Sequence, residues 1–178
     1  SNSLLDAIAF AYSRRVVFVA AAGNSSSNND VTPTYPANYS VPGVISVAST
    51  TDADGLSSFS NFGLSTVHVG SPGSSIWSSL PNNFYGRASG TSMATPFVAG
   101  LAALMLRENS SLSAYQVREL LFAGAQKISS LQTKTTTKAR INAYNSVVAA
   151  KAATGDSSQP SFAASSREPA SAEVAAGC

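Results

Sequence analysis

Continuous apolar runs and helix-periodic segments alternate along the chain, and this alternation predicts an α/β fold. Residues 16–22 (VVFVAAA) and 44–49 (VISVAS) are apolar runs too short for helices, and such runs are typical of strands buried on both faces of a parallel sheet. Apolar residues repeat at helical spacing in residues 3–13, 91–107 and 113–125. We therefore expect a mainly parallel sheet with helices packed against it.

Cap and turn residues refine the element boundaries. Ser3 with Asp6, and Ser113 with Gln116, have the spacing of side chains that cap the N-terminus of a helix. Residues 74–88 contain two short segments on either side of the turn-rich sequence LPNN, a pattern typical of a β-hairpin. The second arm of this hairpin leads directly into the helix predicted from residue 91.

Composition and charge exclude several classes of function. The chain has the length of one domain, with 178 residues, and 11% of them are charged, for a formal net charge of +2. No basic surface therefore indicates a nucleic-acid partner. No apolar run approaches the length of a transmembrane helix, so we expect no membrane partner. The one cysteine, Cys178, excludes a disulfide framework within the chain.

The composition changes near residue 151. The residues that follow are mainly Ala, Ser, Pro and Gly, with few large apolar side chains. Such a segment cannot bury enough surface to offset the entropy of ordering it. We therefore expect a folded domain in residues 1–150 and a disordered tail or linker in residues 151–178.

Asp52 and Asp54 flank a turn, which is one pattern of a metal-binding loop. The further ligands at EF-hand spacing are missing from the sequence. We expect no metal site here and no cofactor.

The sequence Gly90-Thr91-Ser92 opens the helix predicted over residues 91–107. Gly90 supplies the backbone freedom for a sharp entry. A hydroxyl on the first turn lies near free N–H groups and the positive end of the helix dipole, a place suited to a developing oxyanion. Thr91 or Ser92 could equally be a simple helix cap.

Asn24 follows the first apolar run, directly after Gly23. In open α/β sheets the carboxyl ends of strands are where sites are built, and a side-chain amide can donate to an oxyanion. An Asn after a Gly at a strand end is also an ordinary turn residue. The position alone leaves both interpretations open.

Two sequences in this chain resemble motifs of the subtilisin-like serine peptidases, the subtilases. GTSMATPFVAG at residues 90–100 is similar to the nucleophile segment of that family, and AAAGN at residues 20–24 is similar to the segment with its oxyanion-hole Asn. The resemblance implies that Ser92 is the nucleophile, that Asn24 stabilises the oxyanion, and that Thr91 lies beside the oxyanion site.

The resemblance also implies a substrate-binding surface for proteins or peptides. Residues 33–35 correspond to the floor of the pocket for the residue before the scissile bond, with Thr34 at its bottom, which favours an uncharged pocket. An extracellular or secretory location follows from the same resemblance. The implied substrate-binding residues are Ala21, Ala22, Gly23, Pro33, Thr34, Tyr35 and Gly90.

The resemblance extends from residue 1 to about residue 150 and corresponds to the C-terminal part of a subtilase catalytic domain. It implies an incomplete three-layer subtilisin-like fold, with a mainly parallel sheet between helices on both faces and with the N-terminal half missing. Motifs like D-T-G and H-G-T-H, which hold the family's catalytic Asp and His, do not occur in these residues. We expect a missing N-terminal segment to supply them.

His68 is the one histidine of the chain, and we do not expect it to be the base for Ser92. It lies in the strand-like pattern V-H-V and corresponds to a non-catalytic position of the family, which favours a surface or half-buried strand residue. Some subtilases hold a weak cation in this region with two acidic side chains. The matching positions here are Ser65 and His68, so we expect that cation site to be absent.

Three functions are consistent with these observations. The first is a serine endopeptidase that forms an acyl-enzyme on Ser92, with the isolated chain inactive because a serine without a base is a weak nucleophile. The second is a catalytically inactive binding or scaffold module with the same fold. The third, an α/β-hydrolase, is opposed by Ala94 in place of the second Gly of G-x-S-x-G and by the lack of a His after the Ser.

Overall fold

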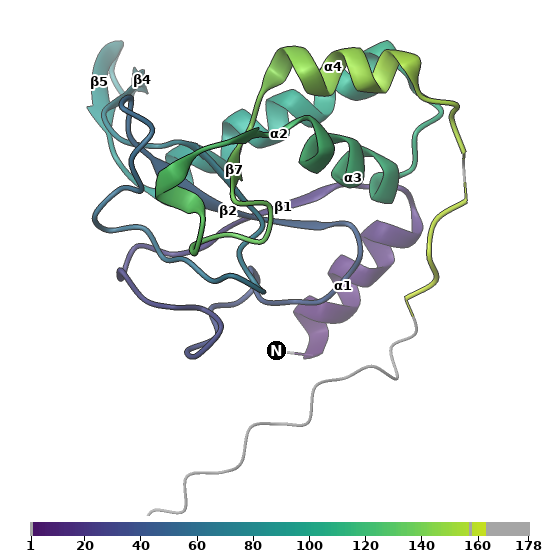
Figure 1. Ribbon diagram of the computed structural model, residues 1–178, viewed down its shortest axis with the longest axis horizontal. Coiled ribbons are helices and arrows are strands. Elements are labelled where there is room, and N and C mark those ends of the chain that lie inside the picture. The colour runs from purple at the N-terminus through teal and green to yellow at the C-terminus, as the bar shows by residue number, and fades with distance from the viewer. Residues whose placement is uncertain (1, 157, 163–178) are drawn as a thin grey trace, which may run out of the picture.

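The apolar runs that predict strands lie in a five-stranded sheet. The computed structural model describes residues 2–156 and 158–162. The sheet has the order β1-β2-β3-β7-β6, and every neighbouring pair is parallel except β7 with β6 (Figure 1). The strands are β1 (Phe18–Ala21), β2 (Val44–Thr50), β3 (Val69–Pro72), β6 (Gln126–Lys127) and β7 (Ala139–Arg140).

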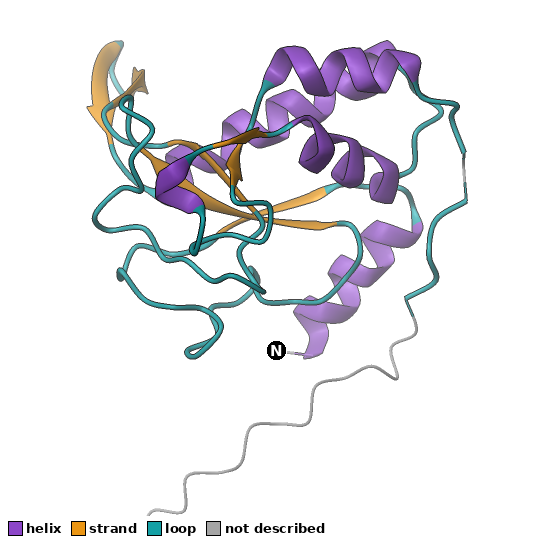
Figure 2. Cartoon of the chain, viewed as in Figure 1, coloured by secondary structure: helices purple, strands orange, loops and turns teal. Residues whose placement is uncertain are grey.

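Helices cover both faces of this sheet. Helix α1 lies on one face, and α2, α3 and α4 lie together on the other (Figure 2). The helices are α1 (Asn2–Ser13), α2 (Thr91–Glu108), α3 (Ala114–Gly124) and α4 (Ala143–Ala152), with a short 3-10 helix, η1 (Ser129–Leu131).

The core follows the alternation of side chains along β2. Ile45 and Val47 pack in a cluster with α2, α3 and α4, whereas Val44 packs with Ile8 and Tyr12 of α1 on the other face. All residues of β2 are buried. The structure therefore confirms the predicted three-layer α/β fold with a mainly parallel sheet.

Strand β1 is less buried than the sequence predicts. It begins at Phe18 rather than Val16, and the Val16 side chain is 49% exposed. Within β1 only Ala20 is buried. The reason is its position, because β1 pairs with β2 alone among the described strands and forms an edge of the sheet. The prediction of burial on both faces is correct for β2 and wrong for β1.

Helix α2 is buried on one side only. Its Val98 and Met105 side chains are fully buried against the sheet. Phe97 and Leu104, on the same helix, are 46% and 55% exposed. The sequence predicts an apolar helix, and the described part of the chain covers only one side of its surface.

The cap and hairpin predictions are mostly confirmed. Ser113 and Gln116 form a reciprocal capping box at the start of α3, with bonds of 3.2 and 3.0 Å. Ser3 does not cap α1, because the helix already includes Asn2. The hairpin consists of β4 (Ile76–Leu80) and β5 (Phe84–Ala88), which pair antiparallel.

The segment predicted to be a tail is only partly described. Helix α4 ends at Ala152, and residues 154–156 and 158–162 contain no helix or strand. The Tyr12 hydroxyl donates to the carbonyl of Pro160 at 2.9 Å, and Phe162 packs against the α1 cluster. Residues 151 and 152 belong to α4, whereas residues 157 and 163–178 lie outside the described residues, so disorder of the segment beyond α4 stays a prediction.

In the two ranges that the structure describes, no helix combines the length and hydropathy needed to cross a membrane.

Candidate active site

Ser92 lies on the first turn of α2 with its side chain exposed. Backbone hydrogen bonds fix this turn to the sheet. The Gly90 N–H donates to the Gly73 carbonyl at 2.8 Å, and the Gly73 N–H donates to the Thr50 carbonyl at 3.0 Å. The nucleophile candidate is therefore held at the carboxyl ends of β2 and β3, the edge of the sheet where the sequence places a site.

The first N–H groups of α2 are not all satisfied within the helix, as is usual at a helix start. The N–H groups of the two residues after Ser92 both donate to the Gly90 carbonyl, at 3.0 and 3.3 Å. The Thr91 N–H donates to the side chain of Asn24. Among residues 2–156 and 158–162, the Ser92 N–H has no acceptor, so it is available to a ligand.

Asn24 takes the place of a helix cap. The N-cap residue of α2 is Gly90, which has no side chain to cap the helix; instead, Asn24 Oδ1 accepts from the Thr91 N–H and from Thr91 Oγ1, each at 2.9 Å. Thr91 is buried, and its hydroxyl also accepts from the Gly23 N–H at 3.2 Å. The interpretation of Thr91 or Ser92 as a simple cap is therefore wrong.

The same contact orients the Asn24 amide. Because Oδ1 is occupied by Thr91, the Nδ2 group of the same amide is not turned towards Thr91 and remains available as a donor. No described residue accepts a hydrogen bond from Nδ2. Asn24 and Ser92, predicted from distant parts of the sequence, are thus joined through Thr91 and each present a free N–H donor.

A small space at Gly90 lies between these two donors. A Cβ atom at Gly90 would lie 3.4 Å from Asn24 Nδ2 and 3.6 Å from the Ser92 nitrogen. The missing side chain therefore leaves room for an atom near hydrogen-bond distance of both groups. N–H donors fixed before substrate arrives are what stabilises an oxyanion.

Asn61 is a positioning residue that sequence reasoning missed. It is 2% exposed. Its backbone N–H donates to the Gly23 carbonyl at 2.8 Å, its Nδ2 donates to the Ala22 carbonyl at 3.2 Å, and its Oδ1 accepts from the Ser25 N–H at 2.8 Å. These bonds hold the backbone on both sides of Asn24. An Asn in a polar stretch between two phenylalanines gives no sequence signal that it will be buried.

Position 23 must be a glycine, because the Asn61 side chain packs directly against it. Its φ is +115°, and a Cβ there would lie 2.5 Å from Asn61 Nδ2. Both the conformation and the close contact exclude a side chain. The turn after β1 is therefore built around the Asn61 side chain.

A second buried amide connects this turn to the predicted pocket floor. Asn29 Nδ2 donates to the Ala22 carbonyl at 2.9 Å, and its Oδ1 accepts from Thr34 Oγ1 at 3.2 Å and from Asn61 Nδ2 at 3.0 Å. The structure thus brings Thr34, the end of β1 and Gly23 together. Pro33 and Tyr35 are exposed beside Thr34.

Ser92 also lines a large, mainly apolar cavity. This cavity, of about 820 Å³, runs between α2 and the β4–β5 hairpin. Its walls include Phe97 and Leu104 of α2 and Trp77 of β4, which is 62% exposed. Large apolar side chains left this exposed are typical of a surface that another protein segment covers.

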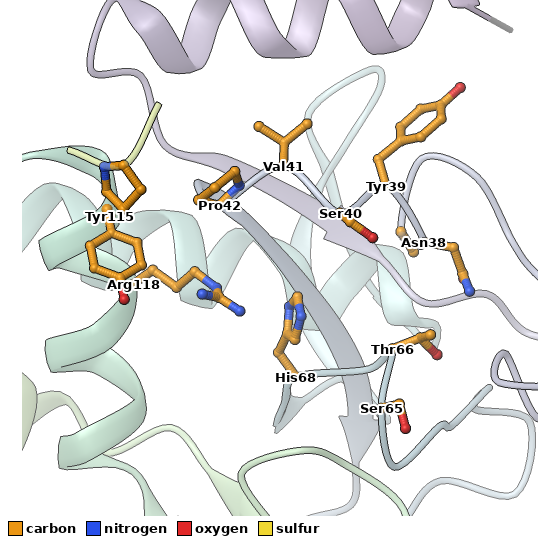
Figure 3. Close-up of a pocket in the computed structure, with 12 residues that line it drawn as sticks. Asn38, Tyr39, Ser40, Val41, Pro42, Ser65, Thr66, His68, Tyr115 and Arg118 are labelled. Atoms are coloured by element: carbon orange, nitrogen blue, oxygen red, sulfur yellow. The ribbon is translucent and has the colours of Figure 1, made fainter. Parts of the chain in front are cut away.

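His68 does not contact Ser92. It lies directly before β3 and is half-buried, and its Nδ1 accepts from the Ser46 N–H at 2.9 Å. Burial, and secondly the charge of Arg118, lower the pKa of His68 to about 3. The imidazole is therefore neutral near pH 7, and it lines a different cavity from the one at Ser92 (Figure 3).

The acidic turn after β2 has a structural role. Asp54 forms a two-point ion pair with Arg140, at 2.6 and 3.3 Å. In the described part of the chain, no group of three or more His, Cys, Asp or Glu side chains could hold a metal ion.

Comparisons with known proteins give consistent matches. A model described as "Subtilase family" matches residues 1–147. Thermitase from Thermoactinomyces vulgaris is 44% identical over 147 residues, which are 83% of this chain and 50% of thermitase. Subtilisin-like protease 2 from Plasmodium falciparum is 39% identical over 136 residues, which are 74% of this chain and 10% of that protein.

A solved structure of a protease from Pseudoalteromonas arctica has a similar fold. Its TM-score is 0.77 at 28% identity, and the match covers 84% of this chain and 47% of the protease chain. The chain spans half of thermitase's length and a tenth of the Plasmodium protein's.

Proposed function

The chain belongs to the subtilase family of serine peptidases, and we propose that it carries the nucleophile and the oxyanion site of a serine endopeptidase. The observation that carries this proposal is the space at Gly90, which is flanked by the free N–H groups of Asn24 and Ser92. A carbonyl oxygen placed there would lie next to the serine that attacks its carbon. Proteins or peptides are the proposed substrates.

The proposed reaction is acyl transfer. Ser92 Oγ attacks the peptide carbonyl carbon while its proton passes to a base, and the carbonyl oxygen becomes an oxyanion. Asn24 Nδ2 and the Ser92 N–H donate to that oxyanion. Collapse of the tetrahedral intermediate expels the amine, which takes the proton, and leaves an ester on Ser92 that water then hydrolyses.

The surroundings support a role for the remaining predicted residues in substrate binding. The edge strand β1 ends at Ala21, and the backbone of Ala22 and Gly23 continues towards Asn24. Thr34 approaches the same turn, since its Cγ2 atom would lie 3.5 Å from a Cβ at Gly23. We assign Ala21, Ala22, Gly23 and Gly90 to the substrate backbone and residues 33–35 to an uncharged side-chain pocket.

The base is proposed to come from a further segment of the same protein, which supplies His and Asp. Among the described residues, none places a base beside Ser92. The exposed apolar surface of α2 and the hairpin supports such a partner, because covering Phe97, Leu104 and Trp77 would stabilise the assembly. Without that segment, we expect the chain to be inactive and prone to association, as exposed sheet edges and apolar faces are.

A catalytically inactive binding module is the alternative, favoured by the lack of a base among the residues that the structure describes. A binding module needs no orientation of Asn24 by Thr91. The two functions differ in whether Ser92 reacts.

An active-site serine probe distinguishes them. A fluorophosphonate should label Ser92 in the full-length protein that carries these residues, and Ser92→Ala should abolish labelling. The isolated chain should label very slowly. No labelling and no peptide hydrolysis by the full-length protein would support the inactive module, whereas rapid stoichiometric labelling of the isolated chain would refute the need for a further segment.

A further inference from the structure

A second cavity, of about 500 Å³, lies between the loop of residues 37–42, the residues before β3, and helix α3 (Figure 3). It does not include Ser92, Asn24 or the space at Gly90. Neither the proposed reaction nor the packing of the fold uses it. Its chemistry is set by Arg118, which is the one charged residue among the described residues that line it.

Arg118 presents donors that the fold does not satisfy. Its Nη1 pairs with Glu119 at 2.9 Å, and its guanidinium lies over the Phe122 ring, 4.8 Å from the centroid. Its Nε is fully buried and has no hydrogen-bond partner among the described residues. Figure 3 shows the guanidinium pointing towards His68. Nε is enclosed and does not reach the cavity, so the donor left for a ligand is Nη2, which has no hydrogen-bond partner among the described residues.

His68 adds a second donor. Because Nδ1 accepts from the Ser46 N–H, a neutral imidazole carries its proton on Nε2. No acceptor for Nε2 occurs in residues 2–156 or 158–162. The imidazole rises from the floor of the cavity beside Arg118 (Figure 3). The cavity thus offers a cation and a neutral N–H donor.

The Asp30 carboxylate does not neutralise this cavity. Asp30 lies behind one wall, where it accepts from the N–H groups of Ser65 and Thr66 and, at 2.7 Å, from the Thr66 hydroxyl. Those donors already satisfy it. No Asp or Glu side chain is among the described residues that line the cavity, so a metal cation would meet Arg118 without a compensating acid.

We propose that this cavity binds a carboxylate, which pairs with Arg118 and accepts from His68 Nε2–H. The planar guanidinium fork matches a carboxylate geometrically. Because Glu119 already pairs with Nη1 of Arg118, little positive charge remains, which favours a monoanion over a doubly charged phosphate. Val41, Pro42 and Tyr115 line the remaining wall, so the carboxylate would carry an apolar or aromatic stem.

Two sources could supply the carboxylate. A small organic acid could bind from solution. Acidic side chains of this chain, Glu168 and Glu173, also follow Phe162 in the sequence, and Pro160 lines the cavity. Both sources have the same chemistry at Arg118, and the experiment separates them.

Benzoate is the probe, and its neutral isostere benzamide is the control. We expect benzoate to bind the full chain in calorimetric titration and to raise its thermal midpoint, whereas benzamide and Ca²⁺ do neither. Arg118→Gln should weaken benzoate binding about tenfold or more, because the charged pair is lost. Arg87→Gln is the matched control, since Arg87 lies on the hairpin over Trp77, and it should leave benzoate binding unchanged.

Equal binding of benzoate and benzamide, or undiminished benzoate binding by Arg118→Gln, would overturn the proposal. If Arg118→Gln does not fold, Arg118→Lys retains the charge without the fork and should still bind benzoate more weakly; unchanged affinity would count against the site. In the Glu168→Gln, Glu173→Gln double variant, tighter benzoate binding indicates that the chain's own carboxylate occupies the cavity, and unchanged binding indicates a ligand from solution.

Discussion

Asn24 Oδ1 accepts two hydrogen bonds from Thr91, one from its backbone N–H and one from its hydroxyl, each at 2.9 Å. These two residues, 67 apart in sequence, join the loop after β1 to the start of α2. One contact therefore caps the helix, fixes which way the Asn24 amide points, and places its N–H donor beside Ser92.

Replacing Asn24 tests the proposed oxyanion site. In the full-length protein, Asn24→Ala should lower kcat by about 10²- to 10³-fold with little change in KM, a magnitude taken from subtilisin itself, that is, from this same family. Steady-state kinetics on a peptide ester and a peptide amide would measure it. Ser25→Ala, at the exposed neighbouring position, is the control. A change in KM alone would assign Asn24 to substrate binding.

Thr91 acts through Asn24, and its hydroxyl can be removed without changing its shape. Thr91→Val should lower kcat by about tenfold, since the amide loses one of its two fixed contacts, and should cost about 0.5–1.5 kcal/mol of stability. Thr91→Ser retains the hydroxyl and should restore most of kcat. If Thr91→Val loses stability but retains kcat, the residue is structural only.

Asn61→Asp should destabilise the protein strongly. The new carboxylate would face the Ala22 carbonyl and Asn29 Oδ1, both of which now accept from Nδ2. Burial of an unpaired charge facing acceptors costs about 3–5 kcal/mol. Urea unfolding measures this, with Asn145→Asp on the exposed surface of α4 as the matched control. Equal urea midpoints for the two variants would contradict the conclusion that the buried hydrogen bonds of Asn61 hold this turn.

The lowered pKa of His68 predicts that the free energy of unfolding depends on pH. Its pKa in the folded protein is lowered to about 3, chiefly by burial, whereas an unfolded His titrates near about 6.5. The unfolded state therefore binds the proton more readily, and stability falls as the pH drops from about 6.5 towards about 3, with a slope of up to ~1.4 kcal/mol per pH unit.

His68→Asn isolates this effect, because its side-chain oxygen can still accept from the Ser46 N–H. Urea unfolding between about pH 7 and about pH 4 should show a shallower loss of stability in the variant. Carboxylates titrate in both proteins and cancel in the difference. Parallel pH profiles would show that the pKa of His68 does not differ between the folded and unfolded states.

Local patterns predicted the elements whose signals are local. The seven buried residues of β2, the periodic stripe of α2 and the capping box of α3 each need only neighbouring residues to be recognised. Strands β6 and β7 have two residues each, so they have no periodicity to detect. They form because β7 pairs with β3, which is a tertiary contact.

The residues of the candidate site also divide into those with local sequence signals and those that depend on tertiary contacts. Ser92 and Asn24 could be located because their surrounding motifs are long. Their connection through Thr91 and the burial of Asn61 depend on segments that are far apart in the sequence. The exposure of Phe97 was also beyond prediction, because an apolar helix position gives no information on what covers it.

The hydrogen bonds from Gly90 to Gly73 and from Gly73 to Thr50 also bear on the dynamics of the site. Amides bonded directly to core strands exchange with solvent mainly through global unfolding, unlike those of mobile loops. We therefore expect the Gly73 and Gly90 amides to exchange slowly, whereas the Ser92 amide beside them, unbonded among the described residues, should exchange faster. The backbone that leads into the candidate nucleophile is thus anchored to the sheet before substrate binds.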